Sequence, residues 1–223
     1  MSAKHERQIE VDTPQGPGRF HLAAADKPRA LLIMGHGAGG GVDAVDLSAL
    51  AARLPERGIS VARFEQPWRV AGKKVASRPP VLDVAWNAAL PAFLGAVDDH
   101  DVELYVGGRS AGARVACRTA PEHDQVLGVV CCAFPLHPPG RPEKSRADEL
   151  LGAGVRRLVL QGERDAFGGP DQIRAVLPAG ESVTLIPVPG ADHSMRVAKS
   201  APITPAQARD LIVDSVADFI TNR

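Results

Sequence analysis

Three residues whose side chains can act together in nucleophilic catalysis are spread along the sequence of 223 residues. The first is Ser110, which stands in Gly108-Arg-Ser-Ala-Gly112, a G-x-S-x-G pattern typical of a nucleophile elbow. A serine on a sharp strand-to-helix turn has a strained backbone, so the residues two before and two after it must be small. The alternative is a glycine-rich turn with an ordinary serine. The apolar run before the pattern and the helical pattern after it favour the elbow.

Asp165 and His193 are the other two candidates, and each follows a predicted strand, as Ser110 does. His193 would accept the proton of Ser110 and later deliver it to the leaving group. Asp165 would hold the imidazole tautomer and stabilise the imidazolium. The competing acids are Glu163, which is nearer the strand end and a weaker rival, and Asp192. Asp192 ranks low because adjacent side chains rarely face each other.

A second glycine cluster, GHGAGGG at residues 35–41, follows the apolar run at residues 30–34. Glycines after a strand let the backbone approach a ligand and point its N–H groups inward. A phosphate cradle lacks its usual Lys-Ser/Thr pair here, and a flexible turn is a second alternative. Together with the elbow, an oxyanion loop is favoured, with the N–H of Ala38 as donor and Gly39 as the nearest alternative. The other donor is the N–H of Ala111, at the start of the predicted helix.

Other side chains near these motifs are candidates for contact with a substrate. We predict such contacts for Arg109, Trp68 and His137. His137 lies in a proline-rich loop at the carboxyl end of a predicted strand, where ligands of open α/β sheets bind, but a histidine simply held by prolines is the competing interpretation. His36 is predicted to be a structural histidine beneath the glycine loop, because the later histidine fits the role of base better.

The elements that must position these residues alternate between strand and helix. Predicted strands cover residues 8–11, 19–23, 30–34, 59–64, 104–106, 127–133, 156–161 and 183–188. Predicted helices cover residues 45–53 and 82–93, start at residue 110, and follow Thr204 as N-cap with Pro205 in first position. This alternation predicts an α/β fold with a mostly parallel sheet, helices on both faces, and active groups at its carboxyl edge.

Several local features refine this architecture. Turn residues between the first two strands predict an antiparallel hairpin at the sheet edge. Gly107 and Gly108 are predicted to end the strand before the serine, and residues 65–80 are predicted to form a long loop. Only about twenty residues separate the strands at 127–133 and 156–161, which leaves space for one short helix and no cap domain. A single domain over residues 1–223 is expected for this length.

The composition limits the class of protein. Basic and acidic residues number 26 each, so no global field attracts nucleic acid or an anionic membrane. The charged N-terminus lacks an apolar signal core, and the longest apolar run is too short to span a bilayer. Cys131 and Cys132 are neighbours in a predicted strand, so they should face opposite ways, which suits reduced thiols in a cytoplasmic protein. No cofactor is expected, and the histidines and cysteines lack the spacing of metal ligands.

Five motifs together carry a resemblance to a known family. They are HGAGG at 36–40, GGRSAGAR at 107–114, FPLHPPG at 134–140, QGERDAFG at 161–168 and GADHS at 190–194. With them the chain resembles the small, capless α/β-hydrolases close to the dienelactone-hydrolase group. More narrowly, it is similar to the branch that includes the hydrolase-like domain of a subunit of the human NSL histone-acetyltransferase complex and its testis-expressed relative. The resemblance implies the serine, aspartate and histidine roles above, but dienelactone hydrolases carry cysteine where Ser110 stands, so their substrate is not carried over.

Two functional classes follow from these observations. The first, which the sequence favours, is a serine hydrolase acting on a small ester, thioester or similar acyl compound through an acyl-enzyme. Without a cap, the pocket is expected to be shallow and partly open, which favours small or flexible acyl groups. The second is a catalytically silent protein-binding module with the same fold, which a sizeable exposed apolar patch would support.

Overall fold

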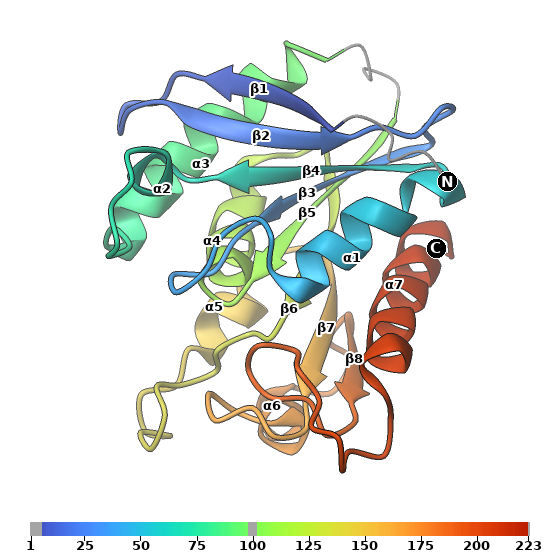
Figure 1. Cartoon of the computed structure of the whole chain (residues 1–223). Helices are drawn as coiled ribbons and strands as arrows, with labels where there is room; N and C mark the ends of the chain where they lie inside the picture. The colour runs from blue at the N-terminus through green and yellow to red at the C-terminus, as the bar shows by residue number, and fades with distance from the viewer. Residues whose placement is uncertain (1–5, 98–101, 223) are drawn as a thin grey trace.

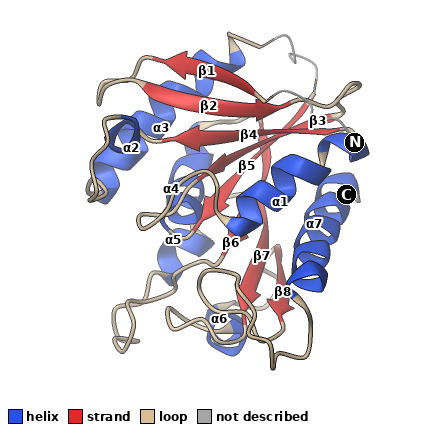
Figure 2. Cartoon of the chain, in the orientation of Figure 1, coloured by secondary structure: helices blue, strands red, loops and turns tan. Residues whose placement is uncertain are grey.

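The computed structural model describes residues 6–97 and 102–222, which are organised around one eight-stranded sheet (Figures 1 and 2). The strand order is β1-β2-β4-β3-β5-β6-β7-β8. The strands are β1 (Arg7–Val11), β2 (Gly18–Ala23), β3 (Ala30–Gly35), β4 (Ile59–Glu65), β5 (Glu103–Arg109), β6 (Val126–Cys132), β7 (Arg156–Gly162) and β8 (Val183–Val188). β2 pairs antiparallel with β1 and β4, and all other neighbours are parallel. This confirms the predicted mostly parallel sheet and its antiparallel N-terminal hairpin.

Helices cover both faces of the sheet (Figure 1). One face carries α1 (Val45–Arg53) and α7 (Pro205–Thr221). The other face carries α3 (Pro79–Leu94), α4 (Ala111–Thr119), α5 (Ala147–Leu151) and α6 (Pro170–Val176). Consecutive residues of a strand point to opposite faces of the sheet and so belong to different hydrophobic cores. Cys131 packs with α3 and α4, whereas Cys132 packs with α1 and α7. The prediction that these two cysteines face opposite ways is therefore confirmed.

The ends of the helices follow the signals in the sequence in some places and not in others. At the start of α7, Thr204 Oγ1 accepts from the N–H of Gln207, and the Gln207 side chain accepts from the N–H of Thr204. This capping box, with Pro205 in first position, confirms the predicted start of α7.

Two short helices were not predicted from the sequence. α2 (Pro67–Val70) lies in the stretch predicted as a loop, and no helix was predicted at the position of α6. Both are too short to show a helical apolar period. The 3₁₀ turns are η1 (Pro55–Arg57) and η2 (Ala120–Glu122).

The prediction that Gly107 and Gly108 end their strand is wrong, because β5 continues through both to Arg109. The two glycines serve close packing instead. A Cβ on Gly107 would overlap the carbonyl oxygen of Val130, and one on Gly108 would overlap the carbonyl carbon of Gly112. These positions therefore let β5 sit tightly against β6 and let α4 begin directly over the sheet.

The carboxyl ends of β3, β5, β7 and β8 meet at one edge of the sheet, where the loops with the predicted site residues begin. Between β6 and β7 the chain forms only the loop at residues 133–146, helix α5 and a short turn, so no cap domain is inserted there, as predicted. In the part of the chain that the structure describes, no helix has the length and apolar character needed to cross a membrane.

Candidate active site

Ser110 lies at the sharp turn between β5 and α4. Its backbone has φ 53° and ψ −111°, a strained conformation for a residue with a side chain. The turn is closed by the N–H of Ser110, which donates to the carbonyl of Cys132 at 3.0 Å. The sharp turn requires glycine at position 112, because a Cβ there would overlap the carbonyl oxygen of Gly35 on β3. The residues around Ser110 thus have the geometry of the predicted nucleophile elbow.

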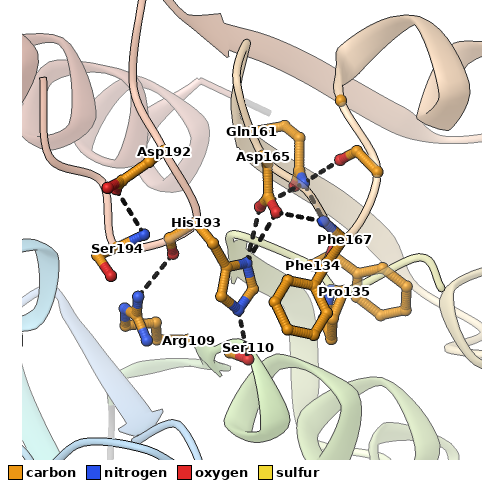
Figure 3. A network of polar contacts seen from close by, with 12 residues as sticks. Arg109, Ser110, Phe134, Pro135, Gln161, Asp165, Phe167, Asp192, His193 and Ser194 are labelled. Carbon is orange, nitrogen blue, oxygen red and sulfur yellow. Dashed lines mark hydrogen bonds and ion pairs between the residues drawn. The ribbon is translucent and has the colours of Figure 1, made fainter. Parts of the chain in front are cut away.

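Ser110, His193 and Asp165 form a continuous line of polar contacts (Figure 3). Ser110 Oγ lies 2.9 Å from His193 Nε2. His193 Nδ1 lies 2.8 Å from Asp165 Oδ2 and 3.0 Å from Oδ1. The carboxylate can only accept at Nδ1, so Nδ1 carries the proton and Nε2 is free to accept from the hydroxyl of Ser110. The side chain of Asp165 is 0% exposed and that of His193 is 20% exposed, so the chain of contacts runs from the interior to the surface.

Two further residues hold Asp165 and His193 in place. Gln161 Nε2 donates to Asp165 Oδ2 at 3.0 Å, and the N–H of Phe167 donates to Oδ1 at 2.8 Å. The ring of Phe167 stacks on the imidazole of His193, with centroids 4.1 Å apart (Figure 3). Neither residue was predicted to belong to the site. For Gln161 the sequence does carry a signal, because a polar residue directly follows the buried Leu-Val-Leu run of β7.

The two rival acids make other contacts. Glu163 Oε2 accepts from the N–H of Gly190 at 2.8 Å. Asp192 Oδ1 accepts from the N–H groups of Ser194 and Arg196, at 2.8 and 3.0 Å. Both carboxylates therefore shape the backbone of the loop that carries the histidine, and the contact with its imidazole is made by Asp165.

The glycine loop after β3 lies against the elbow. A Cβ on Gly37 would come within 3.4 Å of Ser110 Cβ. Ala38 and Gly39 line the same cleft as Ser110, and Ala38 also lines a small adjoining pocket together with Ala111. Within the described residues, the N–H groups of Ala38 and Ala111 donate to no protein acceptor. Both are therefore available to a ligand oxygen, which fits their predicted role as oxyanion donors.

His36 is buried beneath this loop, and both of its ring nitrogens have partners. Nδ1 lies 2.8 Å from the carbonyl oxygen of Gly37 and donates to it, while Nε2 accepts from the N–H of Gln66 at 3.2 Å. Burial lowers the pKa of His36, which favours this neutral form. His36 thus holds the glycine loop to the end of β4, as expected for a structural histidine.

Arg109, Trp68 and His137 were predicted to contact substrate, and each lies in a different part of the structure. Arg109 lines the cleft, but its side chain is already engaged with His193 and Asp46. Trp68 is buried, and its ring centroid lies 5.5 Å from that of His36. It lines the small adjoining pocket, whose volume is about 10 Å³, and does not line the cleft above Ser110. This volume is close to that of one water molecule, so the pocket admits at most a very small group.

His137 lies outside the cleft. Its Nδ1 donates to the carbonyl of Pro138 at 2.9 Å, and its Nε2 accepts from the side-chain amide of Gln172 at 3.2 Å. Its backbone N–H donates to the carbonyl of Phe167 at 3.0 Å. The side chain thus connects the proline-rich loop with α6 and the loop of Asp165, which is the alternative that the sequence analysis left open for it.

The cleft above Ser110 has a volume of about 490 Å³. Its walls are the glycine loop, the start of α1, the elbow and the loop after β8. The lining residues are Ala38, Gly39, Gly40, Gly41, Asp43, Ala44, Val45, Arg109, Ser110, Phe167, His193, Ser194 and Arg196. A cleft of this size is in the ordinary range for small-molecule sites.

A strained serine after one parallel strand, followed in the chain by an aspartate and a histidine on later loops of the same sheet edge, is the arrangement of the α/β-hydrolase class. The comparison with known families agrees. The chain belongs to the alpha/beta hydrolase domain family, whose model matches residues 28–221. This confirms the predicted superfamily, while the narrower likeness to the branch of the NSL-complex subunit stays a prediction.

Several solved structures are similar over nearly the whole chain. An alpha-beta serine hydrolase homologue from Coxiella burnetii is 16% identical, with a TM-score of 0.73 and coverage of 97% of this chain and 100% of the other. An α/β serine hydrolase without a lid from Xanthomonas campestris is 20% identical, with a TM-score of 0.72 and coverage of 100% and 99%. Est1E from Butyrivibrio proteoclasticus is 14% identical, with a TM-score of 0.73 and coverage of 96% and 99%. At these identities the likeness is one of fold.

Proposed function

We propose that this protein is a serine hydrolase that cleaves small ester or thioester-type acyl substrates through an acyl-enzyme intermediate. The observation that carries this proposal is the line of contacts from Ser110 through His193 to Asp165, at 2.9 and 2.8 Å. In it Ser110 is the nucleophile, His193 the base and then the acid, and Asp165 the orienting acid. The strained elbow and the free N–H groups beside it support the same assignment.

In the first half of the proposed reaction, His193 Nε2 takes the proton of Ser110 as Oγ attacks the substrate carbonyl. The N–H groups of Ala38 and Ala111 donate to the oxyanion of the tetrahedral intermediate. When this collapses, His193 gives its proton to the leaving oxygen or sulfur. In the second half, water loses a proton to His193 and attacks the acyl-enzyme, and the proton returns to Ser110 as the acid is released.

The open cleft leads to a prediction about acyl chain length. The cleft has a volume of about 490 Å³, and no cap domain covers it among the described elements. Long acyl chains therefore find little apolar surface there. We expect kcat/KM for p-nitrophenyl acetate and butyrate to exceed that for the dodecanoate by at least about tenfold. Initial rates on this ester series, with the matching thioesters as a second series, measure the preference. A strong preference for the long chain would contradict the proposal of a small acyl group.

Asp165→Asn is expected to lower kcat/KM by about 10³- to 10⁴-fold, because asparagine cannot hold the imidazole in the required tautomer. Glu163→Gln is the matched control, since its amide oxygen can still accept from the N–H of Gly190. It should keep most of the turnover. Steady-state rates of the two variants on one short-chain ester provide the comparison. If Glu163→Gln proved the more damaging, the choice of Asp165 as orienting acid would be wrong.

The alternative of a silent binding module would be favoured by a contiguous apolar patch on the surface. Among the described residues, the exposed large hydrophobic side chains are Val75, Val84 and Leu127. They lie on three different elements, namely the loop after α2, helix α3 and strand β6. Scattered single side chains of this kind are ordinary on a protein surface, so no observation favours the module over the hydrolase.

A further inference from the structure

Arg109 is the last residue of β5 and directly precedes the proposed nucleophile. Its side chain, only 11% exposed, reaches three segments that are distant in the sequence. Nη2 donates to the backbone carbonyl of His193 at 2.6 Å (Figure 3). Nε lies 3.4 Å from Asp46 Oδ2 on α1. Nη1 lies beside the glycine loop, where a Cβ on Gly37 would come within 3.0 Å of it.

Asp46 is the anchor of this arrangement. Its side chain is 0% exposed, and burial raises the pKa of its carboxyl group while the nearby Arg109 opposes that rise. Oδ1 accepts from the N–H of Leu47 at 3.0 Å, whereas Oδ2 has no hydrogen-bond partner in the described chain, and neither has Arg109 Nε. The guanidinium of Arg109 and the carboxyl group of Asp46 are therefore charge partners in the protein interior, where an unpaired charge is costly.

We propose that Arg109, anchored by Asp46, is a positioning residue that fixes the histidine loop against the nucleophile. This inference rests on the proposed hydrolase function. Arg109 is joined to Ser110 by one peptide bond and to His193 by one hydrogen bond, so its side chain sets the separation of the two reacting groups. A substrate contact, the role that the sequence suggested for Arg109, does not fit a guanidinium whose nitrogens already face His193, Asp46 and Gly37.

The first test separates positioning from substrate binding. Arg109→Met keeps the length of the side chain but removes its donors, and a displacement of about 1 Å at the reacting atoms lowers rates by about 100-fold. We expect this fall in kcat and in the rate of labelling by a small neutral fluorophosphonate, with KM for a short-chain ester within about threefold of wild type. A large rise in KM with unchanged labelling would overturn the positioning role and restore the substrate contact.

A structural control distinguishes this effect from a general loss of stability. Arg118 on α4 is 20% exposed and pairs with Asp83 and Glu149 at 2.6 and 2.8 Å, and none of these three residues lines the cleft. Arg118→Met should lower the melting temperature without changing kcat or labelling. An equal loss of kcat in both variants would contradict a specific role for Arg109. If Arg109→Met did not fold, Arg109→Lys, which keeps the charge beside Asp46, should retain part of the labelling rate.

A variant of Asp46 tests the same role from the other side of the ion pair. Asp46→Asn keeps the size of the side chain but removes the charge that faces Arg109 Nε at 3.4 Å. We expect it to lower kcat and the rate of labelling in the same direction as Arg109→Met, with KM for the short-chain ester little changed. Unchanged kcat and labelling in Asp46→Asn would contradict the role of Asp46 as anchor. Absence of labelling in wild type would instead contradict the proposed function itself, so the two failures are distinguishable.

Discussion

Ser110→Ala is expected to lower kcat/KM for a short-chain ester by at least about 10⁴-fold. The reason is that Ser110 carries the only hydroxyl that contacts His193 Nε2 among the described residues, so the acyl-enzyme cannot form without it. The loss should appear in kcat rather than in KM, because the cleft and the oxyanion donors stay in place. Steady-state kinetics on the purified variant, with circular dichroism to verify the fold, provide the measurement.

The control for this variant is Ser145→Ala, which removes an exposed hydroxyl in the loop before α5. It should have wild-type kinetics. Retention of more than a few per cent of the turnover by Ser110→Ala would contradict the nucleophile assignment, because the residual rate without a nucleophile comes only from binding and the oxyanion hole.

The second large effect is expected for His193→Ala, again a fall of at least about 10⁴-fold in kcat/KM. Without the imidazole, Ser110 has no base, and Asp165 loses the group that it orients. The two residues act as a unit, so the double variant of Ser110 and His193 should fall no further than either single variant. Rates of all three variants on the same ester measure this non-additivity.

His123→Ala is the matched histidine control. His123 follows η2, and its Nε2 lies 2.9 Å from the side chain of Asn87, away from the cleft. We expect unchanged kinetics for it. If the double variant were slower than both single variants by the product of their separate losses, the two residues would act independently, and the proposed proton transfer between them would be wrong.

The parts of the fold that the sequence predicted are those with a strong local pattern. These are the apolar runs of the parallel strands and the capping box at Thr204, whose conformations are set by residues close together in the sequence. The three candidate site residues could be found because each follows a predicted strand, and parallel strands bring such loops to one edge. The sequence pattern therefore predicts where these three residues meet, because β5, β7 and β8 are parallel strands of the same sheet.

Other features depend on contacts between distant residues, which a single sequence does not display. Asp46 stands in the first turn of α1, where an acid is ordinary, and nothing in its neighbourhood indicates Arg109 as its partner. Gly107 and Gly108 were interpreted as strand breakers, although their cause is the close approach of neighbouring backbones. Trp68 was predicted to contact substrate, but it lies in α2 with its ring against that of His36.

The central claim is that Ser110 is a nucleophile activated by His193. Its most direct test is reaction of the folded protein with a fluorophosphonate probe, with the modified residue located by mass spectrometry. We predict rapid labelling at Ser110 in wild type and none in His193→Ala, because only the activated hydroxyl attacks phosphorus at a useful rate. A well-folded wild-type protein that is not labelled, or is labelled at another residue, would contradict the claim, and the binding-module alternative would then lead.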